Sequence, residues 1–569
     1  MNAISTPMDI ELAVAAHGGN GVAARQGGMA TARNRLLVAV LLFCGAFLVL
    51  AARTILLGLD AEAPKQAAHK TITIPPVRMA RADIVDRNGE ILATSLEMAS
   101  LSVNPQKIKD PAKAARKLVG VLPELSYAAV KEKLSSSKKF EWIKRKLSPR
   151  QKWAVNELGI PAFEFKNEAE RLYPHGRLAA HAIGYAGLDN EGLGGLEYFF
   201  DERLNDTSVG GGALKLSLDI RVQYAMADEL ESAMRAYQAK GATGLVMNVN
   251  TGEVLAMVSL PDYDPNSVRG VSSEALFNRA TLGVYELGST FKTFTFAAAL
   301  DSGLVDFEDG YDATKPLKIS RFTIQDDHPK NRYLTVPEVF TFSSNIGTAQ
   351  MALELGAERQ RSFLDQLGLL RPATIELSEV GRPLYPERWQ KVSTMTISYG
   401  HGIAVSPLQL VSGISSMVNG GRLLPATLVN NPDNWRHGKS VISETTSRKI
   451  RQLLRMAVTK GTGGRANAIG YRVGGKTGTA EKAVVGGYNT KALVSSFVGV
   501  YPMDDPQYVV FALLDEPKGT KETFGFSAGG WVAAPVVRNV ILRTAPLLGV
   551  APKKEDVGLY KNVALMIEE

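Results

Sequence analysis

One segment near the N-terminus is apolar on every side rather than on one face. Residues 36–52, LLVAVLLFCGAFLVLAA, carry no charge, and the apolar run resumes after Arg53 as TILLGL. At about 1.5 Å per helical residue, such a run is just long enough to cross the hydrocarbon core of a bilayer. We therefore expect a membrane-spanning helix over 36–59. The polar, Gly-rich residues before it predict a disordered tail over 1–35.

The charges beside this apolar run predict its orientation. Arg25, Arg33 and Arg35 precede it, and the positive-inside bias places them in the cytoplasm. A cleaved signal peptide is the competing interpretation. It needs a shorter apolar region and small residues before the cleavage site, which LAA before Arg53 matches poorly. A lipid-modified Cys44 is also disfavoured, because a bulky phenylalanine precedes it. The rest of the chain is then expected on the far side of the membrane.

Alternating segments and turn signals divide the remaining chain. In RADIVDRNGEILATS, residues 81–95, the tetrapeptide Asp86-Arg87-Asn88-Gly89 is a tight-turn signal between two alternating strands, which predicts a hairpin. Charged, helix-forming sequence follows over 110–158. A Gly-rich break, SVGGGALKLSLDIRVQ, marks a boundary near residue 214. The expected divisions are a domain over 60–213, a second domain over 214–548, and a C-terminal tail over 549–569.

The larger domain shows strands first, helices in the middle and strands last. TGLVMNVNTGEVLAMVSL at 243–260 predicts a strand–turn–strand unit, and VSSFVGVYP and QYVVFALLDEP bring strands back near the end. This order favours one antiparallel sheet covered by helices over a doubly wound parallel sheet. No internal repeat is visible. The predicted fold class is α+β.

Composition removes several classes of function. The 569 residues are 45% hydrophobic and 21% charged, and the formal charge of +8 is mild for this length. The densest basic run, KKFEWIKRKLSPRQK at 138–152, alternates with apolar residues as a solvated face or strand would, so no nucleic-acid binding is expected. Cys44 is the only cysteine, and the seven histidines show no paired-ligand spacing. We expect no metal and no other cofactor.

Three short motifs carry the candidate chemistry. ELGSTFKTFTFAAALDSG, residues 286–303, places Ser289 and Lys292 one helical turn apart at the start of an apolar helix. Alone, such a pair is more often a helix cap and a surface lysine, and KLSSSKKF offers two further matches. Ser289 differs because two other motifs follow it. Ser343-Ser344-Asn345 opens another helical pattern, and Lys476-Thr477-Gly478-Thr479 occurs once, in a strand-like segment.

The order S-x-x-K, S-x-N, K-T-G makes coincidence improbable. A serine nucleophile without a histidine partner needs another base, and helical side chains at i and i+3 lie about 5–6 Å apart, so Lys292 can reach the Ser289 hydroxyl. Desolvation and the nearby charge of Lys476 would both lower the pKa of Lys292, which can act as a base only when neutral. Ser343 is expected to relay a proton to the leaving amine. Asn345 is expected to hold Lys292 and a substrate amide.

The third motif points to a peptide substrate. An extended peptide could pair with the strand that carries 476–479, and Gly478 would let its backbone approach closely. A carboxylate, the mark of a peptide C-terminus, would bind a cation flanked by two hydroxyls. This expected pocket consists of Lys476, Thr477 and Thr479. The backbone N–H groups of Ser289 and Thr479 would face the scissile carbonyl. The three motifs together indicate acyl transfer through a serine ester.

With these motifs in place, the sequence resembles a class B penicillin-binding protein, a peptidoglycan D,D-transpeptidase, over about 78–545. RADIVDRNGEILA, RLYPHGRLAAHAIGYAG and GLGGLE resemble the pedestal motifs of that family. TGEVLAMVSLPDYDPN, SYGHGIAVSPLQL and GGKTGTAEK resemble its transpeptidase domain. SSNIG and SYGHGIAVSPLQL are more similar to the division-specific branch (FtsI-like, penicillin-binding protein 3) than to the elongation branch. The sequence departs from the family at Ala82, where Gly is usual, and at Leu287, which replaces a frequent Pro.

The resemblance implies a penicilloyl-serine transferase (β-lactamase-like) domain, whose five-stranded antiparallel sheet is covered by helices. It also implies an elongated α/β pedestal and one N-terminal transmembrane helix in the bacterial inner membrane, with the catalytic domain in the periplasm. The implied reaction joins the D-Ala-D-Ala end of a peptidoglycan stem peptide to a neighbouring stem amine at the division septum. β-Lactams would acylate the same serine. The implied partners are a polytopic peptidoglycan glycosyltransferase and other divisome membrane proteins.

Other functions stay open at this point. An elongation-type transpeptidase would carry the same motifs. A D,D-carboxypeptidase or β-lactamase of the same fold would use water as acceptor, although no clear motif for a deacylating glutamate is present. A non-catalytic penicillin-binding sensor or divisome component is a further alternative. The intact set of Ser289, Lys292 and Lys476 argues against it.

Overall fold

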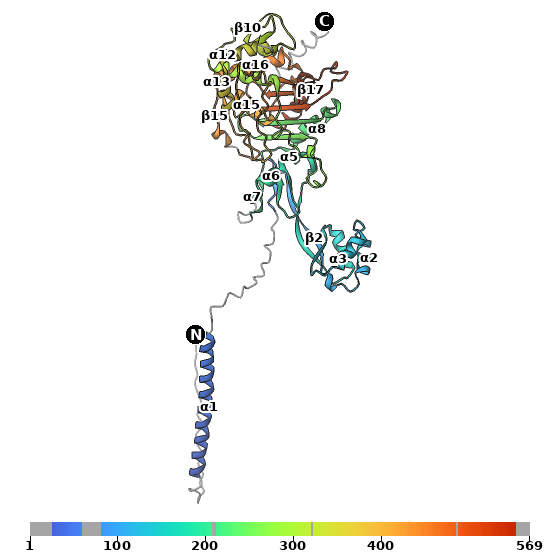
Figure 1. Cartoon of the computed structure of the whole chain (residues 1–569), viewed down its shortest axis with the longest axis vertical. Helices are drawn as coiled ribbons and strands as arrows, with labels where there is room; N and C mark the ends of the chain where they lie inside the picture. Colours follow the sequence, from blue (N-terminus) through green and yellow to red (C-terminus); the bar gives the residue numbers. More distant parts are fainter. Residues whose placement is uncertain are drawn as a thin grey trace, which may run out of the picture. The chain divides into compact units, whose positions relative to one another are not determined.

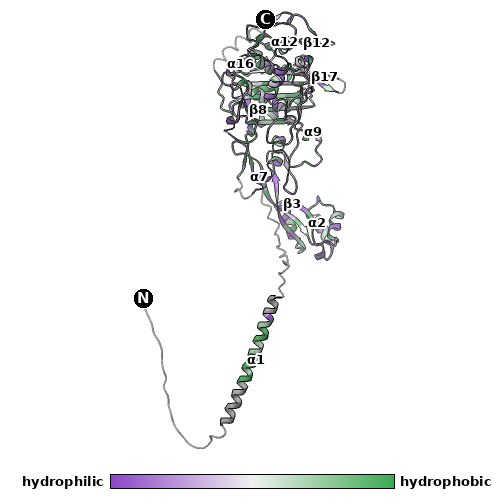
Figure 2. Cartoon of the chain, turned by 60° about the vertical axis from the view of Figure 1, so that its left-hand side comes forward, coloured by the Kyte–Doolittle hydropathy of each residue, from purple (hydrophilic) through white to green (hydrophobic). Residues whose placement is uncertain are grey.

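The computed structural model describes residues 25–59, 81–206, 212–319, 322–431, 433–484 and 487–553. The chain forms two units, residues 1–77 and residues 78–569. In the first unit, α1 (Arg25–Leu59) is long and apolar enough to cross a membrane. Much of this helix has the green colour of hydrophobic residues in Figure 2, and residues 37–54 are exposed.

The helix α1 begins earlier than the sequence predicted. Residues 25–35 were expected in a disordered tail, but they are helical. Their alanines, methionine and arginines have good helix propensity, so the apolar helix extends into them. The rest of the expected tail, residues 1–24, lies outside the described residues.

The second unit begins with the expected hairpin. Strand β1 (Ile84–Val85) pairs antiparallel with β2 (Ile91–Val103). Between them, Asp86 Oδ1 accepts hydrogen bonds from the backbone N–H groups of Asn88, at 2.7 Å, and Glu90, at 2.9 Å. Gly89 has a φ of +92°, a conformation that side chains disfavour. The turn residues therefore fix the hairpin as predicted.

Residues 99–166 form a small lobe with its own apolar core. The charged stretch 110–158, expected to be helical, is interrupted by strand β3, which lies in the alternating basic run. Strand β2 lies between β3 and β4 and pairs antiparallel with both. The elements after β2 are α2 (Pro111–Val121), α3 (Tyr127–Leu134), β3 (Glu141–Leu147), α4 (Pro149–Glu157) and β4 (Phe163–Leu172).

The small lobe leads through short elements into the larger domain. Strand β7 lies directly after the boundary expected near residue 214, yet it pairs parallel with β1. Ile84 and Leu92 belong to the same buried cluster as Leu245 and Phe294. The two expected domains are therefore joined by a common core. The elements here are α5 (Ala180–Ile183), β5 (Tyr185–Ala186), β6 (Gly192–Gly194), α6 (Gly195–Phe199), α7 (Asp201–Asn205) and β7 (Leu214–Lys215).

A buried ion-pair network reinforces this junction. Arg81 and Glu197 are both fully buried, and their side chains approach to 2.9 Å. Arg171 donates to the other oxygen of Glu197 at 2.6 Å. Arg81 also donates to Asp201 at 2.6 Å. Because buried charges are costly unless paired, the network holds these distant segments in one arrangement.

The larger domain is built on the expected five-stranded antiparallel sheet (Figure 1). Successive strand residues face opposite helical layers: Leu245 lies in one core cluster, and Val246 lies in the other. Burial on both faces explains why these strands are almost continuously apolar. In spatial order the strands are β16 (Gly474–Val484), β17 (Gly487–Tyr501), β18 (Tyr508–Asp515), β8 (Gly241–Asn248) and β9 (Val254–Leu260).

Helices cover both faces of this sheet. One core cluster joins α8 (Ile220–Ala236) and α18 (Ala534–Thr544) to the sheet, and the other joins α10, α15 and α16 to its opposite face. The helical elements between the two groups of strands are α9 (Ser273–Leu276), η3 (Gly288–Phe291), α10 (Lys292–Asp301), α11 (Val336–Thr341), α12 (Asn345–Leu355), α13 (Ala357–Gln366), α14 (Lys391–Ile397), α15 (Pro407–Val418) and α16 (Glu444–Thr459).

Short two-stranded sheets lie among these helices: β10 (Gly310–Asp312) with β13 (Tyr333–Thr335), β11 (Leu317–Ile319) with β12 (Phe322–Ile324), and β14 (Arg422–Leu423) with β15 (Lys439–Ser440). At the C-terminal end, the tail expected from residue 549 begins inside the fold. Val550 is buried in a core cluster, and the backbone N–H of Lys553 donates to Gly470 O at 2.9 Å.

Candidate active site

Ser289 lies in the short 3₁₀ turn η3, which leads directly into the buried helix α10. The preceding Gly288 has a φ of +52°, and a Cβ on it would lie 2.4 Å from Thr479 O. A Cβ on Gly400 would in turn lie 2.1 Å from Gly288 O. The turn is therefore clamped between strand β16 and the loop around Gly400. Leu287, which departs from the family pattern, is buried beside it.

Two buried lysines meet at one serine hydroxyl. Lys292 and Lys476 both have an exposed fraction of 0%. Lys292 Nζ donates to Ser343 Oγ at 3.0 Å and to Ser343 O at 2.5 Å. Lys476 Nζ donates to the same Ser343 Oγ at 2.9 Å. Lys292 Nζ also donates to Asn345 Oδ1 at 2.8 Å. One or more residues of each motif are thus brought to one place, and Ser343 bridges the two lysines.

The expected contact between Lys292 and Ser289 is replaced by these bonds. Among the described residues, Lys292 Nζ donates to Ser343 and Asn345, and Ser289 Oγ makes no hydrogen bond. An ammonium has three N–H donors, and these three bonds use all of them. Lys292 can therefore accept a proton from Ser289 only after it has lost one of its own.

Burial lowers the pKa values of both lysines. For Lys292, desolvation lowers the pKa from 10.5 to about 7, and the nearby carboxylates of Asp326 and Asp327 oppose this change. For Lys476, desolvation lowers the pKa well below its ordinary value, and the charge of Lys292 lowers it further. A neutral lysine is therefore accessible at neutral pH, which a lysine base requires.

Asp326 fixes the second motif, although no local sequence pattern predicted this role. Its Oδ1 accepts from the backbone N–H of Ile346 at 2.9 Å, and its Oδ2 accepts from Ser344 Oγ at 2.7 Å. Ser344 is the N-cap of α12 and accepts from Gly347 N at 3.1 Å. Asn345 Nδ2 donates to Gln325 O at 3.0 Å. A carboxylate some twenty residues before a helix gives no local signal that it will cap that helix.

The third motif lies on strand β16, at the edge of the central sheet. Thr477 Oγ1 lies 2.9 Å from Thr462 Oγ1, and Thr479 Oγ1 accepts from Gly529 N at 3.0 Å. A Cβ on Gly478 would lie 2.5 Å from Leu287 O. In this structure Gly478 therefore admits the turn that carries Ser289, whereas the sequence analysis assigned it to the approach of a peptide. Within the described chain β16 pairs only with β17, so its other edge is free to pair with an extended peptide.

A cleft of about 310 Å³ joins the three motifs at the surface. Ser289, Asn345 and Thr479 line it, while the two lysines lie beneath it. The other lining residues are Gly288, Asp327, Tyr399, Gly400, His401, Ala480, Glu481 and Leu493. The described residues contain no group of three or more His, Cys, Asp or Glu side chains that could hold a metal ion. The site therefore offers a half-buried serine, a lysine pair and an open strand edge.

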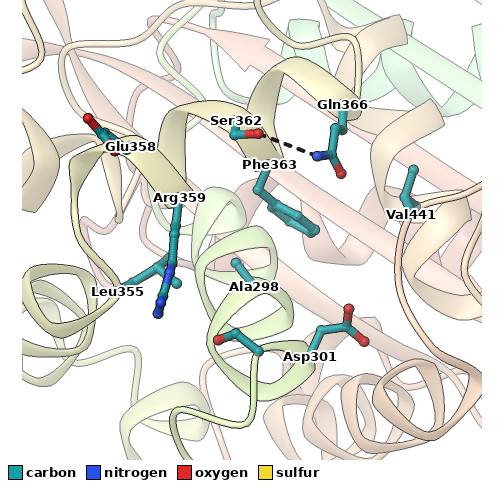
Figure 3. Close-up of a pocket in the computed structure, with 10 residues that line it drawn as sticks. Ala298, Asp301, Leu355, Glu358, Arg359, Ser362, Phe363, Gln366 and Val441 are labelled. Carbon is teal, nitrogen blue, oxygen red and sulfur yellow. Dashed lines mark hydrogen bonds between the residues drawn. The ribbon is translucent and has the colours of Figure 1, made fainter.

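A second cavity, of about 410 Å³, lies at the other end of α10 (Figure 3). Asp301 from α10 and residues of α13, among them Arg359 and Phe363, line it. Ser362 and Gln366 on the same helix are joined by a hydrogen bond of 3.4 Å. None of the predicted site residues lines this cavity, whereas Ser289, Asn345 and Thr479 line the first cleft.

The cleft combines a serine with two nearby buried lysines, and it lies beside an antiparallel sheet with helices on both faces. This combination is typical of the penicillin-recognising serine acyltransferases. Comparison with known families narrows this class. Residues 242–542 match the penicillin binding protein transpeptidase domain, and residues 76–207 match the penicillin-binding protein dimerisation domain. The chain belongs to the class B penicillin-binding proteins of the FtsI type, and it is a serine-type peptidoglycan D,D-transpeptidase of septal cell-wall synthesis.

Individual relatives agree with this assignment. The chain is 41% identical over 497 residues to the probable peptidoglycan D,D-transpeptidase FtsI of Caulobacter vibrioides, covering 85% of this chain and 84% of that protein. It is 33% identical to the probable transpeptidase PenA of Neisseria meningitidis serogroup A, covering 85% and 87%. It is 29% identical to the peptidoglycan D,D-transpeptidase FtsI of Escherichia coli K12, covering 84% and 86%.

Solved structures show the same fold. A peptidoglycan synthetase from Bifidobacterium adolescentis has a TM-score of 0.66 at 22% identity, covering 84% of this chain and 97% of that one. Penicillin-binding protein 3 of Mycobacterium tuberculosis, complexed with aztreonam, has a TM-score of 0.65 at 24% identity, covering 83% and 97%. The family model that matches residues 242–542 is itself named for penicillin binding and transpeptidation.

Proposed function

We propose that Ser289 is the nucleophile of the transpeptidase reaction. Its Oγ attacks the carbonyl carbon of the penultimate D-Ala of a stem peptide, and its proton passes to neutral Lys292. The carbonyl oxygen becomes an oxyanion, which the backbone N–H groups of Ser289 and Thr479 stabilise. The C–N bond to the terminal D-Ala then breaks, and the leaving nitrogen takes a proton through Ser343. The product of this half-reaction is an ester on Ser289.

The second half-reaction reverses these roles. The amine of a neighbouring stem attacks the ester carbonyl and loses a proton to the lysine–serine pair. The new amide bond forms, the C–O bond to Ser289 breaks, and the serine recovers its proton. The observation that carries this proposal is the shared hydroxyl of Ser343, because it hydrogen-bonds to both lysines and so connects the base with a proton donor.

The carboxylate of the donor peptide is proposed to bind at the start of the third motif. Lys476 Nζ lies 3.4 Å from Thr477 Oγ1, and Thr479 lines the cleft beside Ser289. The open edge of β16 offers backbone hydrogen-bond partners to the donor peptide. In this arrangement Asn345, which holds Lys292, also lines the cleft and can receive a substrate amide.

The test of the nucleophile is the location of a covalent adduct. The full-length protein is incubated with a fluorescent penicillin, digested, and analysed by mass spectrometry, with the adduct expected on the peptide that contains Ser289. Ser289→Ala should remove it. Lys292→Arg should be nearly as damaging, because a guanidinium does not deprotonate in proteins. Ser135→Ala and Ser136→Ala are matched controls from the other S-x-x-K pairs and should label normally. An adduct elsewhere would refute the proposal.

A second experiment separates the transpeptidase from a hydrolase of the same fold. After a β-lactam ring opens, its leaving group stays tethered and blocks the entry of an amine. Without a positioned base for water, the ester should persist. A chromogenic cephalosporin in excess should therefore give one burst equal to the amount of enzyme. Steady turnover far beyond that amount would indicate a carboxypeptidase or β-lactamase.

We further propose that α1 enters the inner membrane from the cytoplasm, so that residues after it are periplasmic, at the division septum. The three arginines before the apolar run support this orientation. A C-terminal alkaline phosphatase fusion should be active, and an inactive one would contradict it. The proposed partners are a polytopic glycosyltransferase and other divisome membrane proteins. A fluorescent fusion should lose its septal position when that glycosyltransferase is depleted, and unchanged localisation would argue against the partnership.

A further inference from the structure

The β16–β17 hairpin extends beyond the sheet that supports it. Strand β18 pairs with β17 only from Val494 onward, at Asp515. Beyond that point, residues 482–484 pair with 487–489 alone, after an irregularity between Glu481 and Lys482. We call these two segments the ribbon. An isolated two-stranded ribbon is marginally stable in water, so it needs contacts from outside to keep one position.

Two side chains hold the ribbon, one on each strand. On β16, Lys482 Nζ donates to Glu516 at 2.9 Å and pairs with Asp515 at 2.8 Å. On β17, Tyr488 OH donates to Glu286 Oε1 at 2.9 Å. The first contact ties the ribbon to the end of β18. The second ties it to the residues that lead into the catalytic turn, because Glu286 is three residues before Ser289.

Tyr488 packs against side chains that are themselves held by other contacts. Its ring stacks on His401, with ring centroids 4.4 Å apart and an angle of 30° between the planes. The same Glu286 Oε1 also accepts from the backbone N–H of Gly402 at 3.0 Å. The second oxygen of Glu286 lies 3.5 Å from His401 Nδ1. The side chains of Glu286, His401 and Tyr488, which we call the latch, thus join three segments.

All three of these segments border the Ser289 cleft. Gly400 and His401 line it from one side, and Ala480, Glu481 and Leu493 line it from the hairpin. The loop and the turn are already joined by two backbone hydrogen bonds between Tyr285 and Val405, at 2.9 and 3.0 Å. The ribbon has no comparable backbone link to the turn within the described residues. Its position relative to Ser289 therefore depends on two side-chain ties, Lys482 on one strand and the latch on the other.

We propose that Tyr488 is a positioning residue for the transpeptidase: by bonding Glu286 and stacking on His401, it holds the β16 edge beyond Thr479 in the place where the donor peptide binds. This inference rests on the proposed binding of the donor along β16. Tyr488 touches neither Ser289 nor either lysine. Its loss should weaken noncovalent binding of the acyl donor and leave the chemical step on Ser289 unchanged.

The variant that isolates the latch is Tyr488→Phe, which keeps the stacked ring and removes only the hydroxyl. Full-length protein in detergent is mixed with a fluorescent penicillin over a range of concentrations, and acylation is followed by stopped flow. This yields the dissociation constant of the noncovalent complex and the saturated acylation rate constant. A hydrogen bond to a charged group is worth roughly a factor of ten in an equilibrium constant. We expect the dissociation constant to rise about tenfold and the saturated rate constant to stay within about twofold.

A matched control is available elsewhere in the chain. Tyr311 OH also donates to a carboxylate, Glu354 Oε2, at 3.0 Å, and neither residue lines the cleft. Tyr311→Phe removes the same kind of bond and should leave both acylation constants unchanged. Glu286→Gln keeps an accepting oxygen and should lose less binding than Tyr488→Phe. The double variant Glu286→Gln/Tyr488→Phe should lose little beyond Tyr488→Phe, because both changes act on one bond.

Hydrogen exchange measures the position of the hairpin directly. Backbone amides in 487–493 should exchange faster in Tyr488→Phe than in the parent protein. In Tyr311→Phe they should exchange at the rate of the parent protein. An unchanged dissociation constant, a loss confined to the saturated rate constant, or unchanged exchange in the hairpin would each overturn the latch. Because the chemical step is measured separately, failure of the latch leaves Ser289 acylation intact, whereas failure of the proposed nucleophile would place the penicillin adduct on another residue in every variant.

Discussion

The pKa of Lys292 makes a quantitative prediction for the pH dependence of acylation. An ordinary lysine with a pKa of 10.5 is neutral in only about 0.03% of molecules at pH 7. With the pKa lowered to about 7, about half of the molecules carry a neutral Lys292. The difference corresponds to about 5 kcal/mol, which is the net effect of desolvation against the opposing attraction of Asp326 and Asp327. The fold thus raises the supply of neutral base by roughly three orders of magnitude.

The sign follows from the role of a base. Below pH 7, Lys292 becomes protonated and acylation should slow about tenfold for each pH unit. Above about pH 8 the rate should reach a plateau, because nearly all Lys292 is then neutral. The assay is single-turnover labelling of full-length protein by a fluorescent penicillin between pH 5.5 and 9, with each sample returned to pH 7 to verify that it still folds. Since Ser343 joins the two lysines, the observed inflection belongs to the pair.

A nearby carboxylate tests whether the lysine pair sets this inflection. Asp327 favours the charged forms of both Lys292 and Lys476, so Asp327→Asn should move the acid limb of the profile to lower pH. Asp365→Asn is a matched control, because Asp365 pairs with Arg371 away from the cleft. A profile that is flat between pH 5.5 and 8, an inflection above pH 9, or a shift of Asp327→Asn toward higher pH would refute the general-base role.

Three further predictions concern the support of the site. Gly288→Ala should slow penicillin labelling by on the order of 100-fold, because its Cβ would displace Ser289 from Thr479. Gly303→Ala, at a similar φ but with nothing within 4 Å, should label normally in the same assay. Ser344→Ala should cost about 1 kcal/mol of unfolding free energy by removing the cap of α12, and an unchanged denaturation midpoint would contradict this. Arg81→Met should cost roughly 3–5 kcal/mol by leaving Glu197 underpaired. Arg371→Met, which breaks an exposed ion pair, should lower the unfolding free energy by about 1 kcal/mol or less. Equal losses of unfolding free energy in Arg81→Met and Arg371→Met would show that burial of the ion pair is not the cause.

The sequence predicted those features that have a local pattern. The central sheet was recognisable because its strands are apolar on both faces, and the hairpin at Asp86 because its turn chemistry is local. Lys292, Ser343 and Lys476 were recognisable because each lies in a short motif, and the structure joins them by hydrogen bonds. Ser289, from the same motif as Lys292, lines the cleft with Asn345 and Thr479. For the alternating basic run 138–152, the sequence left a solvated face and a strand both open, and the structure forms β3 there.

Features made by distant residues had no such pattern. Tyr488 and Glu286 are 202 positions apart, and neither residue differs in its local sequence from an ordinary surface residue. Asp326 caps α12 from the loop after β12. The common core of the two expected domains has the same origin: Ile84 and Leu245 meet only in the folded chain, so the Gly-rich break near residue 214 marked a change of composition and not a division of the core.

The paired strands β2 and β4 have a mechanical consequence. They are in register from Thr94 opposite Leu172 to Val103 opposite Phe163, and they connect the small lobe with the core that also contains α10 (Figure 1). A pull on the small lobe along these strands would load their cross-strand hydrogen bonds together, so the β2–β4 pair would resist stretching while still permitting bending. Tension applied to the lobe, as a growing wall or a tethered assembly would apply it, would therefore be transmitted to the residues around Arg81 and Glu197 before it could unfold the lobe.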